Sequence, residues 1–354
     1  MKQTAVKYIL SAAAMALITL FLLRANSAIA YAKAAMEICV STIVPTLFPF
    51  FVCSGILLYS GFCESLAKLF RPCMRPLFRV SPAGAAAFVL GMISGYPLGA
   101  VTAGQLYESG YVTKTEAERL SAFCSNSGPL FILGSVGAAV YANIRIGVLL
   151  YVCHILASLT VGILFRFYKR GDYCAPDTVM TTPKRTVTEI ISIAMDSAVK
   201  TMLAVCGAVI FFGMSGRLVI DLIPADGEIY ALLTGMSEFV TGTLLISGLD
   251  IELTQKLIYT AFVVGFAGLS VHMQVIAAAG RFGLDMRPYL VGKLIHGVLA
   301  LLYTMAALRL FPNAVEVFAP SMSRGVCAAS AQLIIVSGVI LGMAVIIGGR
   351  KGER

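Results

Sequence analysis

A series of long apolar runs constrains this chain more than any other feature. The runs are about 16 to 25 residues long, which is the length at which a helix crosses the hydrocarbon core of a bilayer. They occupy residues 8–23, 34–59, 83–106, 119–141, 144–167, 190–220, 229–249, 257–279, 288–310 and 326–347. Only 13% of the residues are charged, about half the share of a soluble domain, so a soluble enzyme is excluded. The sequence therefore predicts an all-α polytopic membrane protein.

Charge and cysteine content exclude several other classes of protein. The net charge of +9 suits a membrane protein whose cytoplasmic loops collect Lys and Arg. No basic run carries the stacking aromatics of a nucleic-acid site, so we expect no nucleic-acid partner. Most of the nine cysteines lie in apolar segments without a CxxC or Cys/His spacing, so we expect no metal site. Walker, HExxH and nucleophile-elbow motifs are absent from the sequence, and we expect neither a cofactor nor an enzyme.

The N-terminal run, 8–23, has two interpretations. With Lys2 and Lys7 before it and the sequence AIA at 28–30 after it, the run mimics a secretory signal with a cleavage site. Arg24 interrupts the approach to that site, and the run is long for a signal core. We therefore expect an uncleaved first transmembrane helix, with a cleaved signal as the alternative.

Two of the apolar runs are broken at their centres. Pro97 interrupts 83–106, where it removes a backbone donor and clashes with the preceding turn, and Glu238 interrupts 229–249. Each run is predicted to form two half-helices that enter and leave the membrane on the same side. The result is about 8 full spans and two re-entrant hairpins, and it keeps the basic stretch 166–185 in the cytoplasm, as the positive-inside rule requires.

The order of these segments predicts an inverted repeat. A span, a hairpin, a broken span and a span follow one another in the first half, and the same series recurs in the second half from the other side of the membrane. The predicted domains are an N-terminal transmembrane helix (1–33), a first repeat (34–167), a cytoplasmic linker (168–189), a second, inverted repeat (190–311), and a C-terminal transmembrane helix with a basic tail (312–354). Inverted repeats of broken helices are typical of secondary transporters, whose site lies at the repeat interface. A further basic stretch, 68–79, is interpreted as a linker along the lipid headgroups, with a partner-binding site as the alternative.

Four breaks fall at corresponding places in the two halves and form the predicted binding site. They lie at 94–97, 124–129, 237–242 and 265–270. Unwound backbone at membrane depth frees carbonyls and amides, and Pro129 suits the first turn of a half-helix. We therefore expect the amides after Gly128 to face an anion. The alternative is that the breaks are kinks that serve packing alone.

A few charged side chains lie within the predicted spans. Glu238 has no local cation, and we expect it to accept hydrogen bonds from the substrate or to carry a coupling proton. Asp196 and Lys200 can pair on one helix, so a structural ion pair and a supporting role at the site are both open. Lys293 lies near a helix end and is expected to extend toward the headgroups.

The three histidines differ in their surroundings. His154 and His296 each lie singly on an apolar span, and we expect both to be packing residues. His272 follows the fourth break and precedes Gln274, so these two side chains are supporting candidates for the site.

Two motifs in the first half carry a family resemblance. They are GMISGYPLGA at 91–100 and NSGPLFI at 126–132. Both resemble the YlbJ-type sporulation integral membrane proteins, which belong to a wider group with a nucleoside-recognition, or Gate, domain similar to the core of concentrative nucleoside transporters. The resemblance extends over nearly the whole chain. Ser127 departs from the family pattern, in which we expect an Asn-Asn pair before Gly-Pro.

The resemblance implies a function for the chain. It implies a transporter that moves dipicolinic acid, a small organic anion, across the outer forespore membrane during sporulation. Transport of a nucleoside or related metabolite, and a membrane assembly factor that transports nothing, are the alternatives. The expected partners are an anionic small molecule and the lipid bilayer, and a homo-oligomer is left open. Together with the breaks, the resemblance assigns substrate contact to Ser94, Tyr96, Asn126, Ser127, Gly128, Glu238, Thr241 and Ser270.

Overall fold

The computed structural model describes residues 2–61, 68–70, 72–171 and 185–311. Within these ranges every regular element is a helix and no strand occurs, which confirms the all-α prediction. Four helices in the described part are long and apolar enough to cross a membrane: Ile144–Phe165, Val187–Ile220, Leu253–Gly280 and Arg287–Leu310. Shorter apolar helices accompany them, as expected of a multi-pass membrane protein. The predicted C-terminal span, 326–347, lies outside the described residues.

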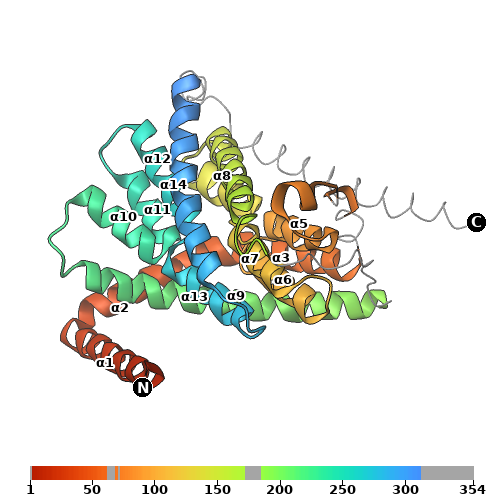
Figure 1. Ribbon diagram of the computed structural model, residues 1–354. Helices are drawn as coiled ribbons and strands as arrows, with labels where there is room; N and C mark the ends of the chain where they lie inside the picture. The colour runs from red at the N-terminus through yellow and green to blue at the C-terminus, as the bar shows by residue number, and fades with distance from the viewer. Residues whose placement is uncertain (1, 62–67, 71, 172–184, 312–354) are drawn as a thin grey trace, which may run out of the picture.

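The same order of helices occurs twice along the chain (Figure 1). A long helix is followed by two short helices, then by two further helices on either side of a break, and then by another long helix. The elements are α1 (Lys2–Leu23), α2 (Ala25–Ile38), η1 (Cys39–Ile43), α3 (Val44–Tyr59), η2 (Met74–Phe78), η3 (Pro82–Gly84), α5 (Ala85–Ser94), α6 (Leu98–Glu108), α7 (Lys114–Cys124), η4 (Leu130–Val140), α8 (Ile144–Phe165), α9 (Val187–Ile220), α10 (Gly227–Ser237), α11 (Phe239–Gly248), α12 (Leu253–Phe266), α13 (Gly268–Gly280) and α14 (Arg287–Leu310).

The breaks lie where the sequence predicts them. Helical structure is interrupted at 95–97 and 125–128 in the first half, and at 238 and 267 in the second. Each interruption falls inside one of the four predicted segments. Local chemistry accounts for much of this agreement, because Gly95, Pro97, Gly128 and Gly268 lie at or next to three of the breaks and disfavour a continuous helix.

In each half the first pair of short helices folds back on itself as a hairpin. A Cβ atom on Gly91 of α5 or on Gly99 of α6 would overlap the carbonyl group of Cys124, at the end of α7. In the second hairpin, a Cβ atom on Gly242 of α11 would overlap the backbone of Gly235 on α10. Glycines at these positions let the backbones approach closely, as small residues do between membrane helices.

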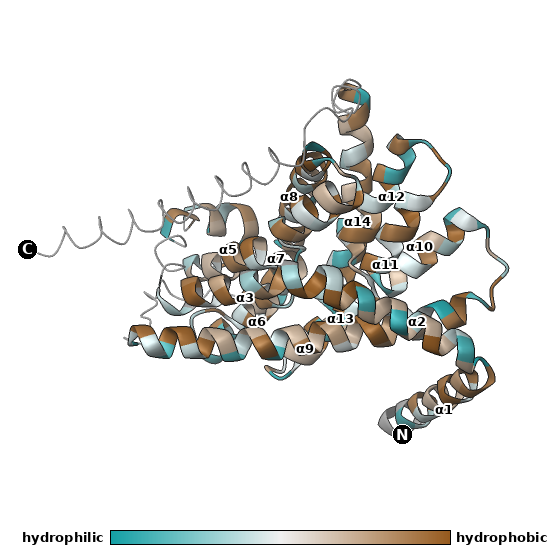
Figure 2. Ribbon diagram, turned by 180° about the vertical axis from the view of Figure 1, so that it is seen from behind, coloured by the Kyte–Doolittle hydropathy of each residue, from teal (hydrophilic) through white to brown (hydrophobic). Residues whose placement is uncertain are grey.

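Long helices frame the two hairpins. The helix α9 runs alongside α2 and α3, and α14 packs against both α8 and α12 (Figures 1 and 2). Thr186 and Glu189 begin α9 with a reciprocal capping box. Apolar residues predominate along α1 and α9, and Leu203 of α9 has 69% of its surface exposed (Figure 2). Exposed apolar faces of this kind are suited to contact with lipid.

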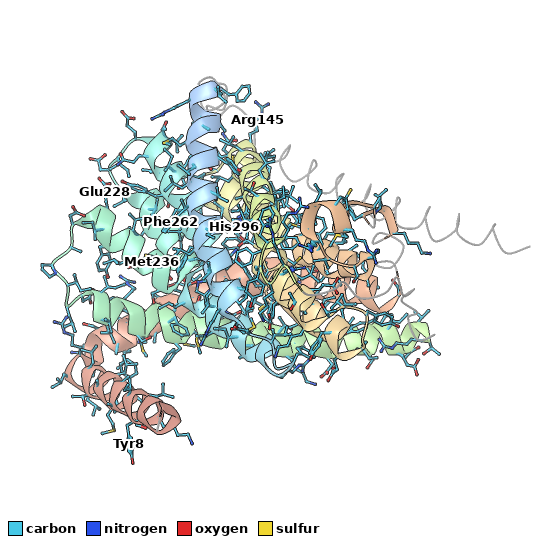
Figure 3. The ribbon with its side chains drawn as sticks, viewed as in Figure 1. Tyr8, Arg145, Glu228, Met236, Phe262 and His296 are labelled. Carbon is cyan, nitrogen blue, oxygen red and sulfur yellow. The ribbon has the colours of Figure 1, made fainter. Side chains whose placement is uncertain are left out.

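Among the helix starts that differ from the predicted ones are those of α2 and α7. The second helix begins at Ala25 rather than at residue 34, and α1 is bent from it by 100° at Arg24. Side chains of α1 such as Tyr8 point away from the body of the protein (Figure 3). The helix α7 begins at Lys114, ahead of the predicted residue 119, because a capping box at Thr113 stabilises its first turn.

Part of the basic stretch 68–79 is packed into the protein. The buried ring of Phe78 stacks on Phe123 of α7, with ring centroids 4.7 Å apart. The guanidinium of Arg119, also on α7, donates a hydrogen bond of 2.7 Å to the carbonyl oxygen of Arg79. The end of this stretch is therefore fastened to α7.

A buried carboxylate connects α7 to the second half of the chain. Glu118 forms an ion pair of 2.8 Å with Lys169, in the loop after α8, and the resulting hydrogen bond raises the pKa of Lys169 above its ordinary value. The other oxygen of Glu118 accepts a hydrogen bond of 3.2 Å from the amide of Asp285, just before α14. These contacts fix the position of α7 relative to the start of α14.

Candidate substrate-binding site

The four breaks meet in two pairs. In the first half, a Cβ atom on Gly95 would lie 3.0 Å from the backbone nitrogen of Gly128. In the second half, a Cβ atom on Gly268 would lie 3.2 Å from the nitrogen of Phe239. Gly95 and Gly268 have φ angles of 78° and 75°, a region that side-chain-bearing residues rarely adopt. Each hairpin tip therefore lies directly against the neighbouring broken helix.

A cavity, here called the central cavity, lies where the two halves of the chain meet. The ring of Phe131 on η4 contacts that of Phe239 on α11, with centroids 4.9 Å apart. Both rings belong to the wall of the cavity. Residues of three breaks line it, and α13 adds Gln274: the break residues are Ser94, Gly95, Tyr96, Ser127, Gly128, Phe239 and Val240.

Hydroxyl groups without a protein partner gather at the first two breaks. The side-chain oxygens of Ser94, Tyr96 and Ser127 are buried, and apart from the mutual approach of the Tyr96 and Ser127 hydroxyls none has a hydrogen-bond partner among the described residues. Buried polar groups in folded proteins nearly always have a partner. Because all three residues line the central cavity, these hydroxyls are available to a molecule bound there.

Two half-helices direct their N-termini to the cavity, and they differ in charge. The N-terminus of α11 is capped by the side chain of Glu238, whose oxygens accept hydrogen bonds from the amides of Val240 and Thr241. The N-terminus of η4, at Pro129, has no side-chain cap. The partial positive charge of a helix N-terminus favours an anion, so the end of η4 is the one that suits an anionic group.

A buried lysine lies behind this part of the wall. Lys293 of α14 is fully buried, and its ammonium group donates a hydrogen bond of 3.3 Å to the carbonyl oxygen of Ser125 in the second break. The same group lies 5.1 Å from the centre of the Tyr96 ring, which forms part of the cavity wall. No carboxylate is within ion-pair distance of Lys293 in the described ranges. A basic group without a counter-charge therefore lies beside the first two breaks.

A second, larger cavity adjoins the first. The two share Phe51, Ser94 and Tyr96 in their walls. The second cavity extends to Arg281 at the end of α13, a residue whose side chain is exposed. An anion that approaches the central cavity by this path first meets a positive charge.

Comparisons with known proteins decide the family. A model of the Gate family, described as nucleoside recognition, matches residues 40–283, which contain all four breaks. The sporulation integral membrane protein YlbJ of Bacillus subtilis (strain 168) is 32% identical over an alignment of 309 residues, and the match covers 77% of this chain and 76% of that protein. The chain belongs to the Gate family, with the YlbJ-type sporulation membrane proteins. No solved structure matches it.

In this Gate-family protein the side chain of Glu238 caps its own helix, α11. Its carboxylate accepts hydrogen bonds of 3.0 Å from the Val240 amide, and of 2.7 Å each from the amide and the hydroxyl of Thr241. Neither Glu238 nor Thr241 lines the central cavity. The structure thus gives both residues a capping role at α11, where the sequence predicted substrate contact.

Asn126 and Ser270 lie near the predicted site but not in the cavity wall. The amide nitrogen of Asn126 donates to the carbonyl of Phe123 at 2.7 Å and to the hydroxyl of Ser158 at 3.0 Å, so it holds α7 against α8. Its side-chain oxygen and the hydroxyl of Ser270 are buried without a partner in the described structure. The Gate-family protein therefore uses Asn126 in part to fix the second break.

The supporting candidates fall in three different places. Gln274 lines the central cavity. The Nδ1 atom of His272 lies 3.0 Å from the hydroxyl of Tyr289 on α14, and this hydrogen bond connects α13 to α14. Asp196 and Lys200 form an ion pair of 2.7 Å whose side chains are 63% and 74% exposed, and the structure does not bring them to the cavity.

The sequence analysis missed the position of Lys293, and it did not foresee that the packing residues His154 and His296 lie beside each other. Lys293 does not extend toward the headgroups, because it is buried against the second break. His296, three residues further along α14, lies at the centre of the molecule with its ring 4.3 Å from that of His154 on α8 (Figure 3). The spacing of Lys293 and His296 places them on one face of the helix, and this spacing is the signal in the sequence that could have revealed the pair.

Proposed function

We propose that this Gate-family protein is a membrane transporter for a small organic anion rather than an enzyme. The observation that carries the proposal is the buried Lys293 beside a cavity lined by helix breaks, with no carboxylate paired to it in the described ranges. Intramembrane charges of this kind commonly belong to a substrate or ion pathway. The uncapped end of η4 and the hydroxyls of Ser94 and Ser127 add donors for a carboxylate.

Dipicolinic acid is the proposed substrate, and the outer forespore membrane is the proposed location. The molecule is a flat ring with two carboxylates, so it needs both positive potential and an aromatic wall. The central cavity offers the rings of Tyr96, Phe131 and Phe239 together with the donors at the first two breaks. The sporulation role in the name of the Bacillus subtilis relative supports this choice.

Uptake into vesicles tests the proposal. Full-length protein in lipid vesicles is expected to take up labelled dipicolinate, and Ser127→Ala is expected to reduce uptake about tenfold, because a hydrogen bond to a charged group contributes about 1.5–3 kcal/mol. Ser247→Ala is the matched control, since that hydroxyl bonds to the Leu244 carbonyl outside the cavity. Equal uptake by Ser127→Ala and the wild type would contradict the assigned contact.

Nucleoside transport is the second candidate, favoured by the description of the Gate family model. Excess uridine is expected to leave dipicolinate uptake unchanged. Competition by uridine would support the nucleoside alternative. Uptake of neither compound would support a membrane assembly factor instead.

We further propose that 34–167 and 190–311 are inverted repeats and that the two hairpins are re-entrant. The repeated order of helices and the matching contacts between hairpin tips and broken helices support this arrangement. A reporter enzyme fused after Lys114 is expected to be active in the cytoplasm, and one fused after Glu252 outside it. The opposite location for both fusions would refute the inverted repeat.

A further inference from the structure

The ammonium group of Lys293 is enclosed by polar groups that carry no negative charge. Besides the Ser125 carbonyl, its neighbour is the Nδ1 atom of His296, at 3.1 Å. The titratable side chains that surround it come from the first break, α8, α13 and α14 itself: Tyr96, His154, His272, Tyr289 and His296. The helices α7 and α12, which also pack against α14, contribute no carboxylate to it in the described part of the chain.

The hydrogen bonds of His296 establish which nitrogen carries the proton. Its Nε2 atom lies 3.0 Å from the carbonyl oxygen of His154, which can only accept, so Nε2 must donate. In the neutral ring Nδ1 is then an acceptor, and it faces Lys293. Lys293 can donate to this nitrogen and to the Ser125 carbonyl whether or not it is charged. The pocket therefore accommodates both the amine and the ammonium form.

These contacts link the charge on Lys293 to the contents of the cavity. An ammonium group that is buried without a counter-charge is costly to keep ionised. An anion in the central cavity, whose wall includes the Tyr96 ring beside Lys293, supplies that counter-charge. Linkage is reciprocal, so an anion that favours the protonated lysine is itself bound more tightly when the lysine is protonated.

We propose that Lys293 is the proton-binding group of this protein and that the transported anion and one proton move together. The inference rests on the proposed anion transport. A proton from water adds to the Lys293 amine as the anion enters the cavity, and it returns to water when the anion leaves. The proton-coupling role suggested for Glu238 by the sequence is thereby transferred to Lys293, since the oxygens of Glu238 are taken up by α11.

Proton uptake on binding tests the inference without measuring transport. Dipicolinate is titrated calorimetrically into the purified full-length protein at neutral pH, in two buffers of different ionisation enthalpy. The wild type is expected to take up about one proton per anion bound. Lys293→Arg is expected to bind dipicolinate with no proton uptake, because its guanidinium is always charged. Lys293→Met is expected to bind at least about tenfold more weakly, since it lacks the charge.

Lys114→Met is the matched control, because Lys114 is exposed at the start of α7 and away from both cavities. It is expected to match the wild type in affinity and in proton uptake. Thermal unfolding verifies that each variant is folded. If Lys293→Arg does not fold, proton uptake by the wild type alone decides the test. Dipicolinate binding by the wild type without proton uptake overturns the inference and leaves anion transport standing. Failure of the wild type to bind dipicolinate overturns both.

Discussion

Gly91→Ala is expected to destabilise the protein by about 3 kcal/mol, at the upper end of the cost of overpacking. The added Cβ atom would overlap the carbonyl group of Cys124, and a backbone carbonyl cannot turn aside as a flexible side chain can. Either the hairpin of α5 and α6 moves away from α7 or the second break is displaced. Thermal unfolding of the purified protein in detergent is expected to show a clearly lowered midpoint, and dipicolinate binding is expected to weaken in parallel.

Gly207→Ala provides the comparison for this substitution. Gly207 lies within α9, and a Cβ atom there meets no other atom within 4 Å. Alanine is the better helix former by about 1 kcal/mol, so this variant is expected to be as stable as the wild type or slightly more stable. A midpoint for Gly91→Ala equal to that of Gly207→Ala would mean that the α5–α7 contact is looser than the structure has it.

Glu238→Ala is expected to destabilise the protein by about 2 kcal/mol, the upper range for loss of an N-cap. The substitution leaves the amides of Val240 and Thr241 and the Thr241 hydroxyl without their acceptor in a buried site. Glu238→Gln is expected to lie between alanine and the wild type, because one oxygen remains as an acceptor while the new amide group faces a donor. Thermal unfolding measures both variants.

Glu252→Ala is the control for the cap. Glu252 occupies the same N-cap position of α12, but its exposed side chain makes no capping hydrogen bond. The change is expected to stay within about 0.5 kcal/mol of the wild type, as for an ordinary surface position. If Glu238→Gln were fully stable and abolished the proton uptake that accompanies dipicolinate binding, the carboxylate of Glu238 would be the coupling group, and Lys293 would not.

The positions of the breaks could be predicted because their causes are local. Pro97, Gly95 and Gly128 act on the backbone within a few residues of themselves, and the helices that they interrupt are recognised by length and apolarity. The all-α class and the family follow from the same short-range signals. The capping box at Thr113 is also a local signal, but a search for runs of apolar residues does not detect it.

The roles of the charged residues could not be predicted in the same way. In a soluble protein the apolar face of a helix points to the core, whereas a membrane helix is apolar both toward lipid and toward its neighbours. Hydrophobic periodicity therefore does not show which side of α14 is enclosed. The packing of α7, α8 and α12 against α14 buries Lys293, while the packing of α9 leaves Asp196 and Lys200 exposed.

The sequence by itself determined that this chain is a helical membrane protein with paired breaks, because helix length, proline and glycine act over a few residues. The tertiary structure alone decided which polar groups face the central cavity and which are already satisfied. Glu238 is bonded to its own helix, and Ser127 and Lys293, from separate segments, lie beside one cavity wall. Such placement depends on contacts between residues far apart in the chain, and no local pattern records them.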